Sequence, residues 1–206
     1  WMEAVATAGL KEVYVKPDLD NSCFVLEPKF HALEKGLSLQ VKLKDGNKVV
    51  ASKKVKATTP MTVILPVKNV KTWSPESPFL YDLEYEVVDA SGKVVDKVVS
   101  YIGMRKIHIE GNRVYLNNQP LYLRMVLDQG FYPDGVWTAP TDADLKRDIE
   151  LSMSVGFNSA RLHQKVFEER FHYWADKLGY ITWGESSSWG ADTNKELTAR
   201  NFLTEW

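Results

Sequence analysis

The stretch 155–186 constrains the fold more than any other part of the chain, because a strand pattern, a helix pattern and a second strand pattern follow one another in it. Residues 158–162 are mostly small or apolar. Four apolar residues then recur at the i, i+3, i+4, i+7 spacing of one helical face, namely Phe171, Trp174, Ala175 and Leu178. Gly179 suits the left-handed position that ends a helix, and residues 180–184 resume a strand pattern. Such a crossover predicts a βαβ unit with two parallel strands.

The alternation of strands and helices extends on both sides of this unit. We expect a strand at 121–128, a helix at 142–155, a strand at 158–163, a helix at 167–178, a strand at 180–184 and a last helix beginning near Asn194. Repeated strand–helix units predict a parallel sheet, either doubly wound or the start of a (β/α)8 barrel. No glycine-rich phosphate-binding motif follows any of these strands, which disfavours nucleotide binding.

Residues 9–102 follow a different, period-two pattern. Within 37–44 and 79–87, apolar residues alternate with polar ones, as in strands that bury one face. About seven such strands, separated by turn signals, predict an immunoglobulin-like sandwich. The chain has a single cysteine, Cys23, so the cysteine pair of antibody domains is absent. We therefore predict a sandwich domain at 1–103 and a second domain at 104–206.

Composition argues against two classes of partner. The net charge of −1 gives no electrostatic basis for binding nucleic acid or an anionic membrane. No apolar run approaches the roughly 18 residues of a membrane span. Seven tryptophans and nine tyrosines suit a ligand with apolar faces, such as a sugar, although aromatic residues also fill cores. Because the chain opens at Trp1, we expect it to be part of something longer.

Polar residues cluster just past the predicted parallel strands. Asp128 ends the first strand, Arg161 and His163 follow the second, and Glu185 follows the third. Because functional sites are built at the carboxyl ends of parallel strands, we expect these side chains to lie close together. Structural interpretations remain open for three of them. Arg161 could pair with a structural acid, His163 could be a buried histidine with satisfied hydrogen bonds, and Asp128 could cap the next turn.

Several short motifs occur in a fixed order along the chain. Residues 73–81 read WSPESPFLY, 103–107 read GMRKI, 116–124 read LNNQPLYLR, 156–161 read GFNSAR and 183–185 read WGE. In this order they resemble the retaining β-glycosidases of glycoside hydrolase family 2, which include β-galactosidases, β-mannosidases and β-glucuronidases. Two positions depart from the family pattern, since Asn118 and Met125 stand where the family has glycine. Asparagine tolerates the left-handed turn conformation, so Asn118 can still serve, whereas Met125 predicts different packing of the first barrel strand.

This resemblance implies a multi-domain chain, in which an all-β immunoglobulin-like sandwich is followed by the first three βα units of an incomplete (β/α)8 TIM barrel. The family's acid/base and nucleophile glutamates follow barrel strands four and seven, which would lie beyond Trp206. We therefore assign no catalytic residue, expect no cofactor and no metal, and predict that the chain alone hydrolyses nothing. The parent protein would be β-galactosidase-like, with a carbohydrate as its partner and neither nucleic acid nor a membrane.

The resemblance also implies a set of substrate-binding residues: Arg161, His163, Asp128, Glu185, Tyr132 and Trp137. Arg161 would lie beside the nucleophile and keep it ionised. Tyr132 and Trp137, in the long loop 130–140, would stack on a sugar face or pack the loop down. Unpaired strand edges in the incomplete barrel predict association with another copy, that is, a homo-oligomer.

Two further interpretations stay open. The chain could be a noncatalytic carbohydrate-binding or adhesion module in which the sandwich binds. It could also come from a metal-dependent hydrolase that uses His163 and Glu185, although one carboxylate near one histidine is weak support for a metal site.

Overall fold

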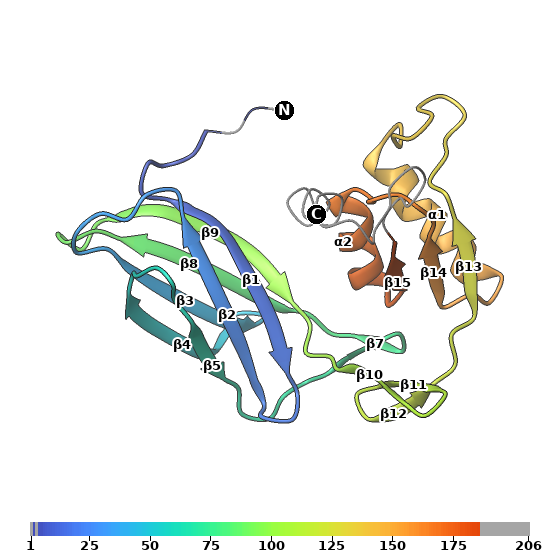
Figure 1. Ribbon diagram of the computed structural model, residues 1–206, viewed down its shortest axis with the longest axis horizontal. Helices are drawn as coiled ribbons and strands as arrows, with labels where there is room; N and C mark the ends of the chain where they lie inside the picture. The colour runs from blue at the N-terminus through green and yellow to red at the C-terminus, as the bar shows by residue number, and fades with distance from the viewer. Residues whose placement is uncertain (1, 3, 186–206) are drawn as a thin grey trace, which may run out of the picture. The chain divides into compact units, whose positions relative to one another are not determined.

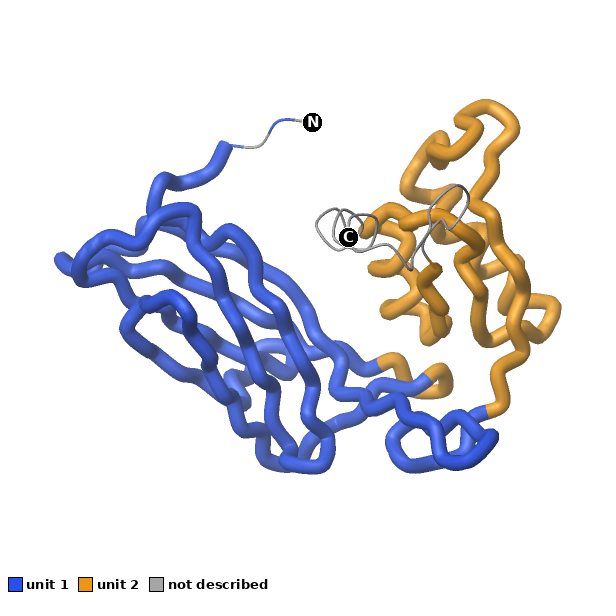
Figure 2. Tube along the Cα trace, viewed as in Figure 1, with its two compact units in different colours: residues 1–74, 79–121 blue, residues 75–78, 122–206 orange. Residues whose placement is uncertain are grey.

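The computed structural model describes residues 2 and 4–185, which form two compact units (Figure 1, Figure 2). Unit 1 contains residues 1–74 and 79–121, and unit 2 contains residues 75–78 and 122–206. The two units are groups of residues that lie close together in space, so they do not test the predicted domain limits. The domains 1–103 and 104–206 therefore stay a prediction.

Unit 1 contains a sandwich of two antiparallel sheets. The strands are β1 (Leu10–Asp18), β2 (Cys23–Phe30), β3 (Ser38–Asp45), β4 (Lys48–Lys56), β5 (Val63–Pro66), β8 (Tyr81–Val88) and β9 (Val94–Ile102). One sheet has the order β1-β2-β5 and the other β4-β3-β8-β9. The seven strands predicted from the alternating pattern are therefore present.

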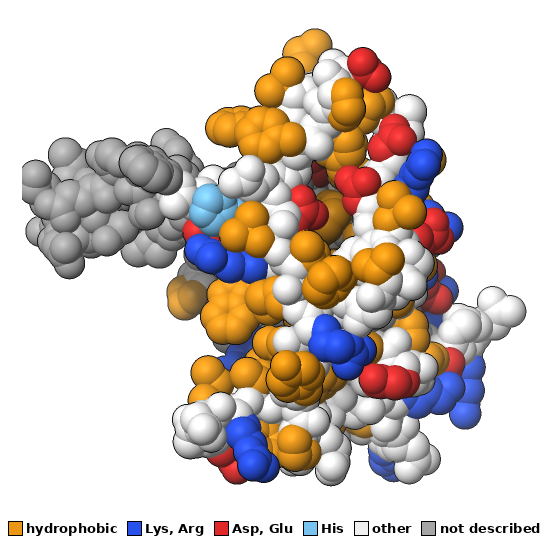
Figure 3. All heavy atoms as spheres, turned by 90° about the vertical axis from the view of Figure 1, so that its right-hand side faces the viewer, with side chains coloured by type: hydrophobic (Ala, Val, Ile, Leu, Met, Phe, Trp, Pro, Cys, Tyr) orange, Lys and Arg blue, Asp and Glu red, His pale blue; other side chains and the backbone are white. Residues whose placement is uncertain are grey.

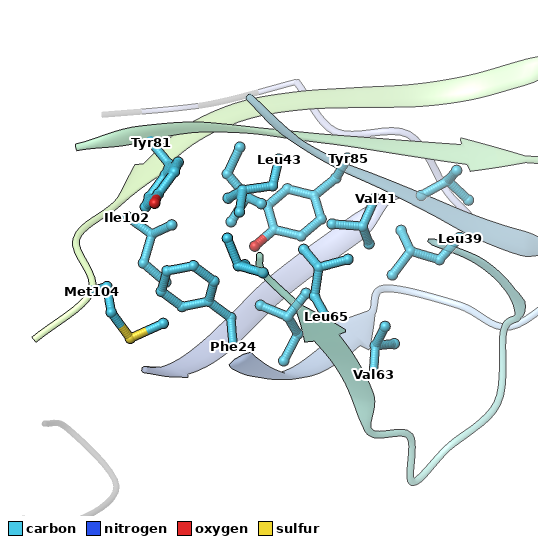
Figure 4. Close-up of a cluster of buried hydrophobic side chains, with 14 of the residues drawn as sticks. Phe24, Leu39, Val41, Leu43, Val63, Leu65, Tyr81, Tyr85, Ile102 and Met104 are labelled. Carbon is cyan, nitrogen blue, oxygen red and sulfur yellow. The ribbon is translucent and has the colours of Figure 1, made fainter. Parts of the chain in front are cut away.

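The alternating residues build the core between these two sheets. Leu39, Val41 and Leu43 of β3 are fully buried. They meet Phe24 and Leu26 of the opposite sheet in one apolar cluster (Figure 4). Their polar neighbours face water, where Lys42 pairs with Glu86 at 3.0 Å and Lys44 pairs with Glu84. Burial of one face and cross-strand ion pairs on the other fix the register of the sheet.

Further short strands lie between β5 and β8 and after β9. They are β6 (Trp73–Ser74), β7 (Ser77–Pro78), β10 (Ile107–Glu110), β11 (Arg113–Leu116) and β12 (Gln119–Leu121), of which β10, β11 and β12 form an antiparallel sheet. At the turn between β11 and β12, Asn117 and Asn118 have φ of 52° and 64°. The left-handed conformation expected of Asn118 is thus confirmed. The Asn117 amide also donates to the Trp73 carbonyl at 2.9 Å, which ties two of the sequence motifs together.

The strand predicted at 121–128 is wrong as one element. Leu121 ends β12, where it pairs with Val114, and β13 (Met125–Asp128) begins after a break. Between them the Arg124 backbone N–H donates to Asn158 Oδ1 at 2.8 Å. Residues 121–128 alternate without interruption between apolar and other side chains. Within this segment, however, the backbone leaves the antiparallel hairpin and joins the parallel sheet.

Unit 2 alternates strands and helices. β13 is followed by α1 (Asp142–Ser154), β14 (Ser159–Leu162), α2 (Glu169–Leu178) and β15 (Ile181–Gly184). The three strands form one sheet in the order β13-β14-β15, and both pairs are parallel (Figure 1). The parallel βαβ arrangement predicted from residues 155–186 is confirmed. The helix predicted near Asn194 lies outside the described residues.

Local signals begin and end the helices as expected. Thr141 is the N-cap of α1, and its hydroxyl accepts a hydrogen bond from the Asp144 N–H. Gly179 ends α2 in the left-handed conformation with φ of 82°. None of the helices in the described part of the chain is long and apolar enough to span a membrane.

The two helices cover one face of the parallel sheet. Leu145 and Ile149 of α1 and Phe171 and Ala175 of α2 are buried in one cluster with Ala160 and Leu162 of β14. Because side chains alternate along a strand, Arg161 points to the opposite face, together with its register partners Leu127 and Trp183. Leu127 is 50% exposed and Trp183 is 53% exposed. Figure 3 shows that hydrophobic side chains also gather at the surface of the molecule.

Candidate functional site

An ion pair joins the ends of the second and third parallel strands. Arg161 Nε donates to Glu185 Oε2 at 2.5 Å, and both side chains are partly exposed. The hydrogen bond from Arg161, followed by its charge, holds the pKa of Glu185 below its ordinary value. In turn the hydrogen bond to Glu185 and its charge raise the pKa of Arg161. The predicted proximity of these two residues is thus found, and Glu185 stays ionised at neutral pH.

His163 lies next to this pair. Its backbone N–H donates to the Asp128 carbonyl at 2.8 Å, which extends the pairing between β13 and β14. Its ring Nδ1 is 3.2 Å from Gln129 Nε2, and because an amide nitrogen only donates, Nδ1 is the acceptor. The neighbouring His163 side chain and a hydrogen bond from the Gln164 backbone also lower the pKa of Glu185. Gln164 itself has φ of 50°.

Asp128 lies on the other side of the sheet. Its register partner is Leu162, which is buried under the helices, so the alternation places Asp128 on the helix-covered face rather than with Arg161. Its carboxylate accepts the Gly130 N–H at 2.8 Å, which is the turn-capping geometry considered from the sequence. Burial raises the pKa of Asp128, and the nearby Asp148 charge acts in the same direction. Its observed contacts are therefore structural.

The loop between β13 and α1 separates the two predicted aromatic residues. The Tyr132 ring packs against the core cluster of unit 2, and its hydroxyl donates to Asp148 Oδ2 at 2.6 Å. Burial and the hydrogen bond to Asp148 raise the pKa of Tyr132. Trp137 instead is 59% exposed and lies beside Phe131, which the sequence reasoning did not single out. Tyr132 thus anchors the loop, whereas Trp137 is presented at the surface.

Lys165 is a second residue that the sequence reasoning missed. Its ammonium donates to the Gly130 carbonyl at 3.0 Å and to the Trp137 carbonyl at 2.7 Å, and lies 4.8 Å from the centre of the Phe167 ring. Burial lowers the pKa of Lys165. A lone lysine in a polar loop gives no signal of this role, because the carbonyl groups that it binds lie about thirty residues away.

Chemically, the edge of the sheet offers a fixed guanidinium, an ionised carboxylate and an imidazole. All three groups can hydrogen-bond hydroxyl groups, and the guanidinium can also bind a further carboxylate. Within the described residues, no group of three or more histidine, cysteine, aspartate or glutamate side chains is placed to hold a metal ion.

Comparison with known proteins relates the chain to one enzyme family. The model of the family "Glycosyl hydrolases family 2" matches residues 8–105. A β-galactosidase from Lactococcus lactis is 29% identical over 181 residues, which cover 86% of this chain and 18% of that protein. A putative β-glucuronidase from Formosa agariphila is 30% identical over 177 residues, which cover 82% of this chain and 21% of that protein. The chain thus spans about a fifth of the length of these relatives.

Solved structures share the fold. A β-glucuronidase from Ruminococcus gnavus in complex with D-glucaro-d-lactam superposes with a TM-score of 0.78 at 24% identity, covering 98% of this chain and 33% of that chain. A β-glucuronidase from Dictyoglomus thermophilum has a TM-score of 0.74 at 24% identity, covering 87% of this chain and 29% of that chain. At this identity the likeness concerns the fold alone, and it extends over both units.

Proposed function

Because the chain belongs to glycosyl hydrolase family 2, we propose that it is part of a retaining β-glycosidase, β-galactosidase-like, that hydrolyses O-glycosidic bonds. In this proposal the sandwich is the immunoglobulin-like domain, and residues 104–206 supply the first three βα units of a (β/α)8 barrel. Three adjacent parallel strands, with helices on one face and partly exposed side chains on the other, support the barrel interpretation.

The Arg161–Glu185 pair is the observation that carries the proposal. It fixes a guanidinium at the carboxyl ends of two neighbouring parallel strands, on the face that the helices leave uncovered. A barrel builds its active site at this end. The bond to Glu185 uses one of the five N–H donors of Arg161, so the guanidinium has donors for a second carboxylate.

A retaining glycosidase needs two carboxyl groups about 5–5.5 Å apart, one as nucleophile and one as acid/base. We assign neither to this chain. Arg161 would hold the nucleophile ionised through charge-assisted hydrogen bonds, while Glu185 fixes the orientation of the guanidinium. His163 would contact hydroxyl groups of the sugar from the same edge. The chain would then supply one wall of the pocket and no catalytic residue.

Activity assays with aryl β-glycosides test this proposal. We expect no turnover by the 206-residue chain above a buffer blank, and turnover of an aryl β-galactoside by the whole protein to which it corresponds. In the whole protein, Arg161→Lys should lower kcat with little change in KM, because lysine keeps the charge but not the forked geometry. A whole protein that binds sugars but cleaves no β-glycoside would leave the noncatalytic module as the better interpretation.

A further inference from the structure

The loop between β13 and α1 presents two neighbouring aromatic rings at the surface. Phe131 is 57% exposed and Trp137 is 59% exposed. Their ring centres lie 5.7 Å apart at an angle of 60°. Single exposed apolar residues are common on protein surfaces, whereas two large adjacent rings form a patch that binding of an apolar-faced ligand would stabilise.

Hydrogen bonds hold the backbone beneath the rings. Tyr132 and Val136 exchange backbone hydrogen bonds of 2.8 Å and 3.0 Å, which close a tight turn between the two aromatic positions. Lys165 binds the carbonyl groups of Gly130 and Trp137, at both ends of that turn. The Tyr132 hydroxyl anchors the same turn to Asp148 on α1. The backbone that carries the two rings is therefore held in position before any ligand arrives.

Backbone strain accompanies this fixation. Val136 has φ of 57°, an unfavourable conformation for a β-branched residue. Gly135 has no room for a side chain, because a Cβ atom would lie 1.8 Å from the Thr138 carbonyl oxygen. Gly130 has φ of 62°, and a Cβ atom there would lie 2.7 Å from Lys165 Nζ. A strained loop that displays apolar rings is typical of a preorganised ligand-binding surface.

The charge of the loop selects among ligands. Residues 128–144 include four aspartates and no lysine or arginine. The nearby ammonium of Lys165 is directed at two carbonyl groups. An anionic ligand would meet repulsion here, whereas a neutral ring with C–H groups on one face suits the aromatic pair.

From these observations we propose that Phe131 and Trp137 form a stacking platform for an uncharged pyranose ring of the substrate. The identification of the ligand as a carbohydrate rests on the proposed function. The loop that carries the platform starts at the strand ends that bear Arg161 and Glu185, where Gln129 contacts the His163 ring. The platform is therefore placed to take a second sugar unit next to the one being cleaved, and to prefer a neutral unit over a uronate.

NMR titration of the 206-residue chain tests the platform directly. The probes are lactose and sodium glucuronate, and the signal is the indole N–H of Trp137, assigned by its loss in Trp137→Phe. We expect lactose to shift this signal at millimolar concentration and glucuronate to bind at least about tenfold more weakly. Trp137→Ala and Phe131→Ala should each weaken lactose binding by about tenfold or more.

Two further variants separate stacking from general effects. Tyr122→Ala removes an aromatic ring of the same unit that is 79% exposed but lies outside the platform, and should leave lactose binding unchanged. Lys165→Met keeps both rings but frees the two carbonyl groups, and should weaken lactose binding. An unshifted Trp137 signal, or equal binding of glucuronate, overturns the platform. If lactose binds there while the whole protein cleaves no glycoside, the platform stands and the proposed function fails.

Discussion

Gly179 at the end of α2 allows a sharp test of the packing in unit 2. It has φ of 82°, and its N–H donates to the Ala175 carbonyl at 3.0 Å. A Cβ atom at this position would lie 2.4 Å from the Pro75 carbonyl oxygen and 3.0 Å from the Pro75 carbonyl carbon. Gly179→Ala therefore adds a methyl group both in an unfavourable backbone region and against a neighbouring backbone that cannot easily move.

The two effects can be estimated separately. Left-handed backbone costs an L-residue about 1–2 kcal/mol, and forcing atoms into a packed site costs about 1–3 kcal/mol more. Gly179→Ala should thus lower the free energy of unfolding of unit 2 by about 2–5 kcal/mol. Gly156 follows α1 with φ of 95°, and a Cβ atom there meets nothing within 4 Å. Gly156→Ala is the matched control and should lower the free energy of unfolding of unit 2 by only about 1–2 kcal/mol.

Urea unfolding followed by circular dichroism at about 222 nm measures this difference, because the helices α1 and α2 both belong to unit 2. We expect a clearly lower midpoint for Gly179→Ala than for Gly156→Ala. Equal destabilisation by the two variants would mean that the Pro75 carbonyl does not confine Gly179, and would refute the steric argument.

Three other predictions concern charge and exposed apolar surface. Burial raises the pKa of Asp128 in the folded state above 3.8. The wild type therefore loses stability as the pH rises from 3.8 through the folded-state pKa. Urea unfolding should show that Asp128→Asn gains stability relative to the wild type over this pH range. Arg161→Gln should raise the pKa of Glu185 toward its ordinary value, measured by carboxyl ¹³C NMR, because the main cause of its lowering is removed. Replacing both Leu127 and Trp183 with serine should reduce self-association in sedimentation velocity, because both side chains are half-exposed on the uncovered sheet face.

Each of these has a control on the same unit. Asp134→Asn makes the same change at an exposed carboxylate of the same loop and is the matched control. Lys146→Gln breaks the Lys146–Glu150 pair on α1 and should leave the Glu185 titration in place. Leu151→Ser removes an exposed leucine of α1, away from the sheet, and should not change self-association. A purely monomeric wild type at high concentration would contradict the association prediction.

Local physics explains why much of the fold was predictable from the sequence. Alternation with period two marked the strands of the sandwich, and the spacing of Phe171 and Ala175 marked the buried face of α2. Residues with special backbone preferences, such as Asn118 and Gly179, marked the turns that they occupy. These signals depend on neighbours in the chain, so the sequence alone carries them.

Partner choice and side-chain direction were not predictable in the same way. The apolar alternation of residues 121–128 continues across the break at residues 122–124, and it is compatible with either strand partner. Asp128 was expected at the same rim as Arg161, either as a ligand contact or as a turn cap, and the register of the parallel sheet places it on the helix-covered face. A shift of one position along a strand reverses the face, and only the pairing decides that position.

The sequence by itself determined most of the strand and helix segments, the parallel crossover and the motifs that point to a glycosidase family. Only the tertiary structure decided that Arg161 and Glu185 form a pair, that Tyr132 faces inward, and that Lys165 fixes the loop which displays Phe131 and Trp137. The physical reason is distance along the chain. Periodicity and turn preferences act between near neighbours, whereas hydrogen bonds, ion pairs and burial in this site join groups that only folding brings together.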